Sequence, residues 1–132
     1  MDDKAKILSQ YRIEKAEEDL EVARLNFHYD KLLQSVNRSY YSIFHAVRAL
    51  LAFDLFDSKR HSAIIAYFNK HYIASEKIDK KYYKMLASAF DLRIKSDYQD
   101  FYVISKTEAK EQLDNAVEFI NMVKSFIENN IK

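Results

Sequence analysis

Hydrophobic residues recur every three to five positions along most of the chain, which is the spacing of amphipathic helices. The first such segment runs from about Asp3 to Phe27, and its opposite face is acidic between Glu14 and Glu21. Its apolar stripe comprises Leu8, Tyr11, Ala16, Leu20, Ala23 and Phe27. We therefore predict a first helix that buries this stripe, followed by a turn at HYDK.

The second segment, about Lys31 to Phe53, is the most hydrophobic part of the chain. Its stripe comprises Leu32, Leu33, Val36, Tyr40, Ile43, Phe44, Val47, Leu50 and Leu51. A stripe this wide is typical of the central helix of a bundle. The polar run DLFDSK that follows predicts a loop.

Two further helices follow this loop. A short helix is predicted from about His61 to His71, with Ile64, Ile65, Phe68 and Tyr72 facing inward. Asp79 can cap the next helix by accepting free backbone N–H groups. The stripe of that helix comprises Tyr82, Met85, Leu86, Ala89 and Phe90, and the pattern lapses after Lys95 through SDYQDFYVI.

The last helix begins with a capping-box signature, in which Ser105 and Glu108 each satisfy the other's backbone N–H. Its stripe comprises Ala109, Leu113, Ala116, Val117, Ile120, Val123 and Ile127. Stripes of this kind can be buried only against one another. We predict an all-α fold, an up-and-down four-helix bundle with an additional short helix, as a single domain over residues 1–132.

Composition excludes several classes of protein. Glycine and proline are absent, which argues against hairpin-rich folds and against glycine loops that cradle phosphate. Cysteine is also absent, so disulfides, thiolate metal sites and a cysteine nucleophile are excluded. No histidine pairing typical of a metal site occurs, and we expect neither metal nor cofactor.

No segment approaches the ~20 apolar residues of a membrane span, and the N-terminus lacks a signal-peptide core. We expect a cytoplasmic protein.

Charge is unevenly distributed although the net charge is only +1. Residues 59–95 contain nine Lys and Arg against three acids, and residues 96–132 contain four against seven. The basic middle is either a surface that faces RNA or an ordinary solvated helix face. Because its basic residues are spread over two segments, a single DNA-recognition helix is disfavoured.

Four strings carry a resemblance to a known family. They are NRSYYSIFHAVRALL at 37–51, KRHSAIIAYFNKHYI at 59–73, AFDLRIKSDYQDF at 89–101 and SKTEAKEQLDNAVEFI at 105–120. In this order they resemble the HEPN domain family, small all-helical proteins often encoded beside minimal nucleotidyltransferases. The resemblance implies a homodimer and a nucleotidyltransferase partner. Many members are metal-independent ribonucleases, and some are toxins of toxin–antitoxin pairs.

The family motif is an arginine followed, after four to six residues, by a histidine, and two such motifs form one site at the dimer interface. Arg93 matches the arginine, but Asp97 and Tyr98 stand where the histidine is expected, and no histidine follows His71. Arg93 can still bind phosphate bidentately. A carboxylate of pKa ~3.9 or a phenol of pKa ~10 replaces an imidazole poorly at pH 7. Catalysis by Arg93, Asp97 and Tyr98 is therefore an open question.

Each of these residues also has a purely structural interpretation. Arg93 and Asp97 would form an i,i+4 ion pair if the helix continues that far. Tyr98 either packs its ring and exposes its hydroxyl or, as the resemblance implies, accepts an adenylyl group from the partner transferase.

Arg38, Tyr41, His45 and Arg48 recur at helical spacing on the central helix. They form either a polar rim or one wall of the cleft that contains Arg93. In the second case Arg38 and Arg48 would bind nucleic-acid phosphates, and His45 would supply the imidazole that the motif lacks. We interpret His61 as anchoring a loop and His71 as a surface residue. The sequence leaves two hypotheses for the function. The protein is either a toxin-like protein that binds or cleaves RNA or nucleotide, or a non-catalytic helical scaffold.

Overall fold

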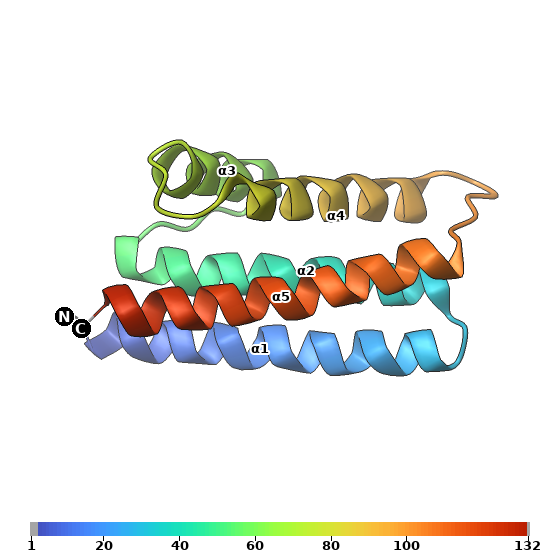
Figure 1. Cartoon of the computed structure of the whole chain (residues 1–132), viewed down its shortest axis with the longest axis horizontal. Helices are drawn as coiled ribbons and strands as arrows, with labels where there is room; N and C mark the ends of the chain where they lie inside the picture. The colour runs from blue at the N-terminus through green and yellow to red at the C-terminus, as the bar shows by residue number, and fades with distance from the viewer. Residues whose placement is uncertain (1–2, 132) are drawn as a thin grey trace.

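The structure is a computed structural model that describes residues 3–131, and within that range it contains helices and loops but no strand (Figure 1). The long helices are α1 (Asp3–His28), α2 (Leu32–Leu51), α4 (Lys80–Tyr98) and α5 (Lys106–Asn130). The short elements are a 3-10 turn, η1 (Ala52–Asp54), the helix α3 (His61–Phe68) and a π-helical turn, η2 (Asn69–Ile73). The predicted all-α bundle with an additional short helix is confirmed.

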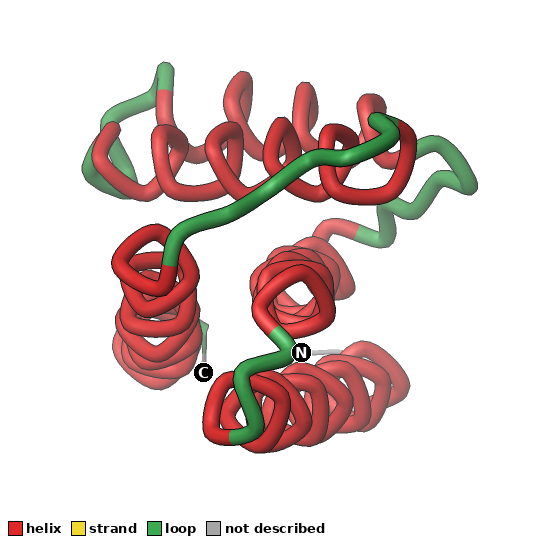
Figure 2. The backbone as a smooth tube through the Cα atoms, turned by 90° about the vertical axis from the view of Figure 1, so that its right-hand side faces the viewer, coloured by secondary structure: helices red, strands yellow, loops and turns green. Residues whose placement is uncertain are grey.

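The helices form two layers. Helices α1, α2 and α5 lie alongside one another, and α3 and α4 form a second layer above them (Figure 1). Figure 2 looks nearly along the first three helices, whereas α3 and α4 run across that view. Helix α2 contacts α1, α4 and α5, as expected of the most hydrophobic segment. None of the helices described here has the length and apolarity that crossing a bilayer requires.

Small residues allow α1 and α2 to approach closely. Ala16 and Ala23 of α1 are fully buried against α2. The hydroxyl of Ser42 donates to the carbonyl of Ala16 at 2.8 Å, and that of Ser35 donates to the carbonyl of Ala23 at 2.9 Å. These two buried hydroxyls therefore have partners, which removes the penalty of burying them.

The prediction for the first apolar stripe is wrong at two residues. Leu8 is 40% exposed and Tyr11 is 56% exposed. The buried face of α1 instead comprises Ala5, Ser9, Arg12, Ile13, Ala16, Leu20 and Ala23. Arg12 lies on this face because its guanidinium donates to the carbonyl of Arg48 at 2.9 Å and to Asp57 at 3.1 Å. Residue type alone could not predict this, since the partners belong to distant segments.

The predicted helix caps are confirmed. The carboxylate of Asp79 accepts from the backbone N–H of Lys81 at 2.8 Å. At α5, the hydroxyl of Ser105 accepts from the N–H of Glu108 at 3.0 Å, and the Glu108 carboxylate accepts from the N–H of Ser105 at 3.3 Å.

Ser105→Ala is expected to lower the free energy of unfolding by about 1 kcal/mol, because the first turn of α5 loses the acceptor for an N–H group. Urea denaturation measures this change. Thr107→Ala is the matched control, because Thr107 is exposed in the same turn and its side chain makes no hydrogen bond. An equal loss in both variants would contradict the role of the cap.

Helix α4 continues beyond the hydrophobic lapse and ends at Tyr98. Two i,i+4 ion pairs support these polar turns: Asp91 with Lys95 at 3.0 Å and Arg93 with Asp97 at 3.1 Å. Hydrophobic periodicity did not predict this extension because its charged side chains pair with one another and interrupt the apolar stripe.

Candidate functional site

Side chains from three helices converge on Tyr41, a half-buried residue of α2. Arg93 of α4 donates from Nη2 to the Tyr41 hydroxyl at 2.9 Å. The guanidinium carbons of Arg93 and Arg38 lie 5.4 Å and 4.7 Å from the centre of the Tyr41 ring, within the range of cation–π contacts. The His61 ring of α3 and the His45 ring lie 5.8 Å and 6.2 Å from the same ring. The fold therefore gathers Arg93, Arg38 and both imidazoles around one phenol.

Arg93 is held on two sides. Its side chain is only 17% exposed, and its Nε lies 3.1 Å from Asp97 Oδ2. Asn37 Nδ2 lies 3.4 Å from both oxygens of Asp97. The i,i+4 pair anticipated from the sequence is thus present, and a phosphate that approached Arg93 would share it with Asp97 and Tyr41.

A surface hollow of about 560 Å³ opens beside Tyr41. Its lining includes Tyr41, Phe44, His45, Arg48, Asp57 and His61. Its volume lies within the range of small-ligand sites. A neighbouring hollow is lined by Arg38, Asn37, Ser96 and Asp97, among others. Arg93 connects the two hollows, because it bonds to Tyr41 of the first and pairs with Asp97 of the second.

His61 is the best-positioned imidazole in this cluster. Its ring stacks on Phe44 at 4.0 Å, and its Nδ1 lies 2.6 Å from the hydroxyl of Tyr40. Burial raises the pKa of Tyr40, so this phenol stays protonated. A hydroxyl can donate or accept, so the bond suits either tautomer of His61. When Nδ1–H donates to the Tyr40 hydroxyl, Nε2 is the unprotonated nitrogen that can accept a proton. Burial, then the charges of Arg93 and Arg48, lower the pKa of His61. The ring is therefore neutral at pH 7.

His45 is more enclosed. Its side chain is 14% exposed, and its Nε2 lies 3.7 Å from Asp19 Oδ2, beyond hydrogen-bond distance. Burial lowers its pKa to about 4, assisted by the charges of Arg48, Lys15, Arg38 and Arg12. His45 lines the same hollow as Tyr41. Because of its lowered pKa it is a neutral imidazole at pH 7, not the imidazolium that a general acid requires.

Acidification is expected to destabilise the fold through His45. The unfolded chain takes up a proton near pH 6.5, whereas the folded chain does so only near pH 4. Stability is then complete above pH 6.5 and falls as the pH approaches 4, by at most on the order of 3 kcal/mol. His61 adds to this loss, and Asp19, whose pKa is raised by burial, opposes it at the acidic end.

Urea denaturation at pH 7 and pH 4.5 measures this dependence. His45→Phe should remove most of the difference between the two values, whereas His28→Phe, at an exposed position, should keep it. A difference that is unchanged in His45→Phe would contradict the assignment.

Like Arg93, the other two arginines predicted to bind phosphate are each paired with a carboxylate. Arg38 lies 3.1 Å from Asp19, and Arg48 lies 2.9 Å from Asp57. Asp57 also pairs with Arg12 at 3.1 Å. These pairs fix the guanidinium groups in place and partly neutralise them, so a polyanion would have to share them with the carboxylates.

Tyr98 lies apart from the cluster around Tyr41. It is the last residue of α4, and it is 72% exposed. Phe101 and Val103, in the loop that follows, are 100% and 84% exposed. The structure therefore brings together Arg93, Asp97, Arg38, Arg48 and His45 but leaves Tyr98 outside, on an accessible surface.

Sequence reasoning missed His61 and Tyr40. His61 was interpreted as a loop anchor, and Tyr40 as one member of an apolar stripe. Their link depends on how the start of α3 packs on α2, and no spacing along the chain encodes that. The available signal was the position of His61 inside a string that resembles the HEPN family.

Comparison with known proteins agrees with this architecture. A family model, the HEPN domain, matches residues 9–126. A UPF0332 protein of Thermotoga maritima is 30% identical over 129 residues, which cover 98% of this chain and 97% of that protein. "Putative toxin MJ0142" of Methanocaldococcus jannaschii is 31% identical over 115 residues, which cover 87% and 78%. The family match extends from the first turns of α1 into the last turns of α5 and includes the whole cluster around Tyr41. The chain therefore belongs to the HEPN domain family.

Proposed function

We propose that this protein is a toxin-like HEPN ribonuclease that cleaves RNA without a metal ion and uses His61 in place of the missing motif histidine. One observation carries the proposal: His61 and Arg93 approach the same residue, Tyr41, from two different helices. The toxin names of two relatives, which are 31% and 30% identical to this chain, support the biological role.

The chemistry requires one proton acceptor and one anion site. Neutral His61 takes the proton of a ribose 2′-hydroxyl, whose oxygen then attacks the adjacent phosphorus. The bond to the 5′-oxygen breaks, and that oxygen receives the proton, giving a 2′,3′-cyclic phosphate and a 5′-hydroxyl. Arg93 and Arg48 stabilise the charge that develops on the phosphoryl oxygens.

The test is cleavage of RNA by the purified protein in the presence of EDTA. We expect Arg93→Ala to lower the rate by roughly 100-fold, the scale of removing one group that stabilises transition-state charge. Arg24→Ala, at an exposed position of α1, is the matched control. A wild-type protein without activity, or equal rates for Arg93→Ala and Arg24→Ala, would refute the proposal.

A minimal nucleotidyltransferase is the proposed partner, and Tyr98 is its proposed target. The exposure of Tyr98 supports this role. The phenol oxygen would bond to the α-phosphorus of ATP, with release of pyrophosphate and the phenolic proton. Mass spectrometry after incubation with the transferase and ATP should find one adenylyl group, which Tyr98→Phe abolishes. Tyr29→Phe, at a position 68% exposed, should retain it. An adduct that persists in Tyr98→Phe would exclude this site.

A second candidate is a non-catalytic scaffold within a cytoplasmic assembly. The carboxylates that pair with Arg12, Arg38, Arg48 and Arg93 favour it, because they reduce the charge available to RNA. A wild-type protein that binds a partner protein but neither binds nor cleaves RNA would select this function.

A further inference from the structure

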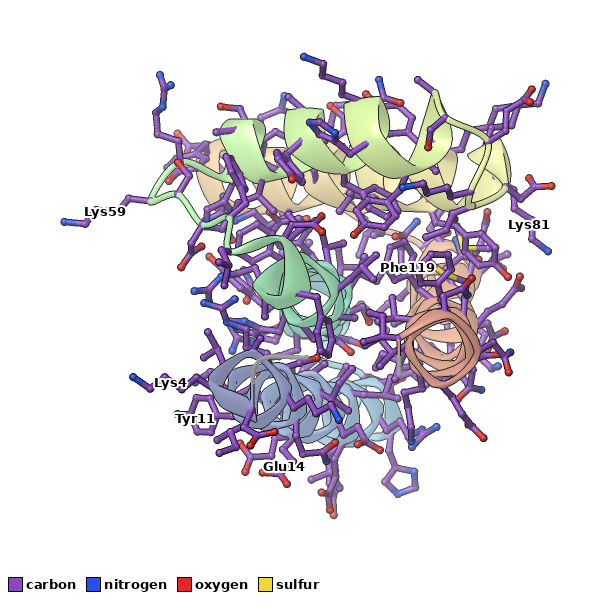
Figure 3. The ribbon with its side chains drawn as sticks, turned by 90° about the vertical axis from the view of Figure 1, so that its left-hand side faces the viewer. Lys4, Tyr11, Glu14, Lys59, Lys81 and Phe119 are labelled. Carbon is purple, nitrogen blue, oxygen red and sulfur yellow. The ribbon has the colours of Figure 1, made fainter. Side chains whose placement is uncertain are left out.

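Helix α1 carries a second apolar stripe on its outer face. The stripe comprises Leu8, Tyr11, Val22, Leu25 and Tyr29, which are between 40% and 68% exposed. Figure 3 shows Tyr11 projecting outward from α1. Leu8 and Tyr11 form one apolar patch, and Val22, Leu25 and Tyr29 form a second patch further along the helix. Exposed apolar patches of this kind mark interaction sites.

The spacing of this stripe is that of a coiled-coil seam. Lys15 and Glu18 lie midway along the stripe. With these two residues included, the positions 8, 11, 15, 18, 22, 25 and 29 are separated by alternating steps of three and four residues. Such a repeat places one residue of each pair at an a position and the other at a d position of a heptad. We name these seven residues the α1 seam.

The α1 seam is complementary to itself when two copies run antiparallel. With the two-fold axis between residues 16 and 17, Leu8 faces Leu25 of the second copy, and Tyr11 faces Val22. Lys15 then faces Glu18 of the second copy at the centre. Because of the two-fold symmetry, each of these contacts occurs twice, once in each direction. In a parallel arrangement Lys15 would face Lys15 and Glu18 would face Glu18, so charge selects the antiparallel pairing.

The charges at the centre lie on the correct face. Glu18 is exposed, and the ammonium of Lys15 lies 5.6 Å from the ring centre of Tyr11, a neighbouring member of the seam. At one edge, however, Glu14 would lie beside Glu21 of the second copy. This like-charge contact weakens the pairing.

We propose that the outer face of α1 is a self-association surface, on which a second copy of this chain docks antiparallel through the α1 seam. The contact from Leu8 to Leu25 extends over about 25 Å of helix at 1.5 Å per residue. The seam contains neither Arg93 nor His61, and it touches the candidate site only at Val22, which also lines the hollow of Arg38 and Asp97.

Sedimentation velocity over a range of concentrations tests this proposal. Leu25→Asp should remove one association step and halve the apparent mass, whereas Val103→Asp, at a position 84% exposed in a loop, should not. Both side chains are exposed, so both variants should remain folded and unfold cooperatively. A wild-type mass equal to one chain at every concentration, or an unchanged mass for Leu25→Asp, overturns the proposal.

A charge swap tests the register. Lys15→Glu places like charges at the centre and should raise the dissociation constant of this step at least tenfold. The double variant Lys15→Glu/Glu18→Lys should restore it, and Glu21→Lys should lower it below the wild-type value. Failure of the double variant to recover would exclude the antiparallel register.

Disulfide trapping gives the direction directly, since the chain contains no cysteine of its own. A mixture of Leu8→Cys and Leu25→Cys chains should form a cross-linked dimer under mild oxidation, while each variant alone should remain uncrosslinked. Equally fast cross-linking of either single variant would indicate a parallel pair and overturn the proposal.

Discussion

His61→Asn is expected to slow RNA cleavage by roughly 10²–10⁴-fold, the contribution typical of a positioned acid or base. His61 is the imidazole that stacks on Phe44 and bonds to Tyr40 within the hollow beside Tyr41. Asparagine keeps a polar side chain of moderate size but cannot accept the proton of a 2′-hydroxyl. The loss should therefore fall on kcat more than on KM.

The pH profile adds a second measurement. Because burial and the charges of Arg93 and Arg48 lower the pKa of His61, the wild-type rate should rise with pH with its midpoint below pH 6.5, the ordinary value of a histidine. His61→Asn should lose this limb of the profile. Tyr40→Phe should retain it with a reduced rate, since it removes only the bond that orients the ring.

His71→Asn is the matched control for His61→Asn. His71 is exposed, its ring centre lies 4.1 Å from that of Tyr67 in a tilted arrangement, and it does not line the hollow. Equal loss of activity in the two variants, with both folded, would show that the effect does not arise from the site. Full activity in His61→Asn would remove His61 from the mechanism.

Phe119→Ala is expected to lower the free energy of unfolding by about 3–5 kcal/mol. Phe119 is fully buried and lies between α5 and the upper layer in Figure 3. Its ring lies 5.9 Å from those of Phe68 on α3 and Tyr82 on α4. Truncation leaves a cavity where three helices meet, and close-packed neighbours can fill it only in part.

Phe101→Ala is the matched control, because it makes the same substitution at a fully exposed position. Its effect should lie within about 0.5 kcal/mol of zero. Urea denaturation of both variants measures the difference. A loss below 1 kcal/mol in Phe119→Ala would contradict this prediction, because it would show that the packing of Phe119 contributes little to the stability of the fold.

Hydrophobic periodicity and cap chemistry predicted most of the fold because both act locally. The stripe of α5 and its capping box depend on residues within a few turns of one another, so the chain itself displays them. The prediction failed for Leu8 and Tyr11 of α1. Two apolar stripes compete on that helix, and the buried one contains Arg12, whose partners are distant in sequence.

The candidate site was predictable only in part. Arg93 and Asp97 were identifiable from the family resemblance, and their ion pair follows from helical spacing. The grouping of Arg93 with Tyr41 and His61 was not predictable, because it joins three helices whose relative placement depends on side-chain packing.

The sequence by itself determined that this chain forms an all-α bundle, that it resembles the HEPN family and that its motif lacks a histidine. These properties depend on composition, periodicity and local strings. Only the tertiary structure decided which imidazole stands beside Arg93 and which stripe of α1 remains exposed. Both outcomes depend on contacts between segments that are distant in sequence. Burial and charge pairing at these contacts determine which helix face is buried, and the sequence alone does not distinguish the alternatives.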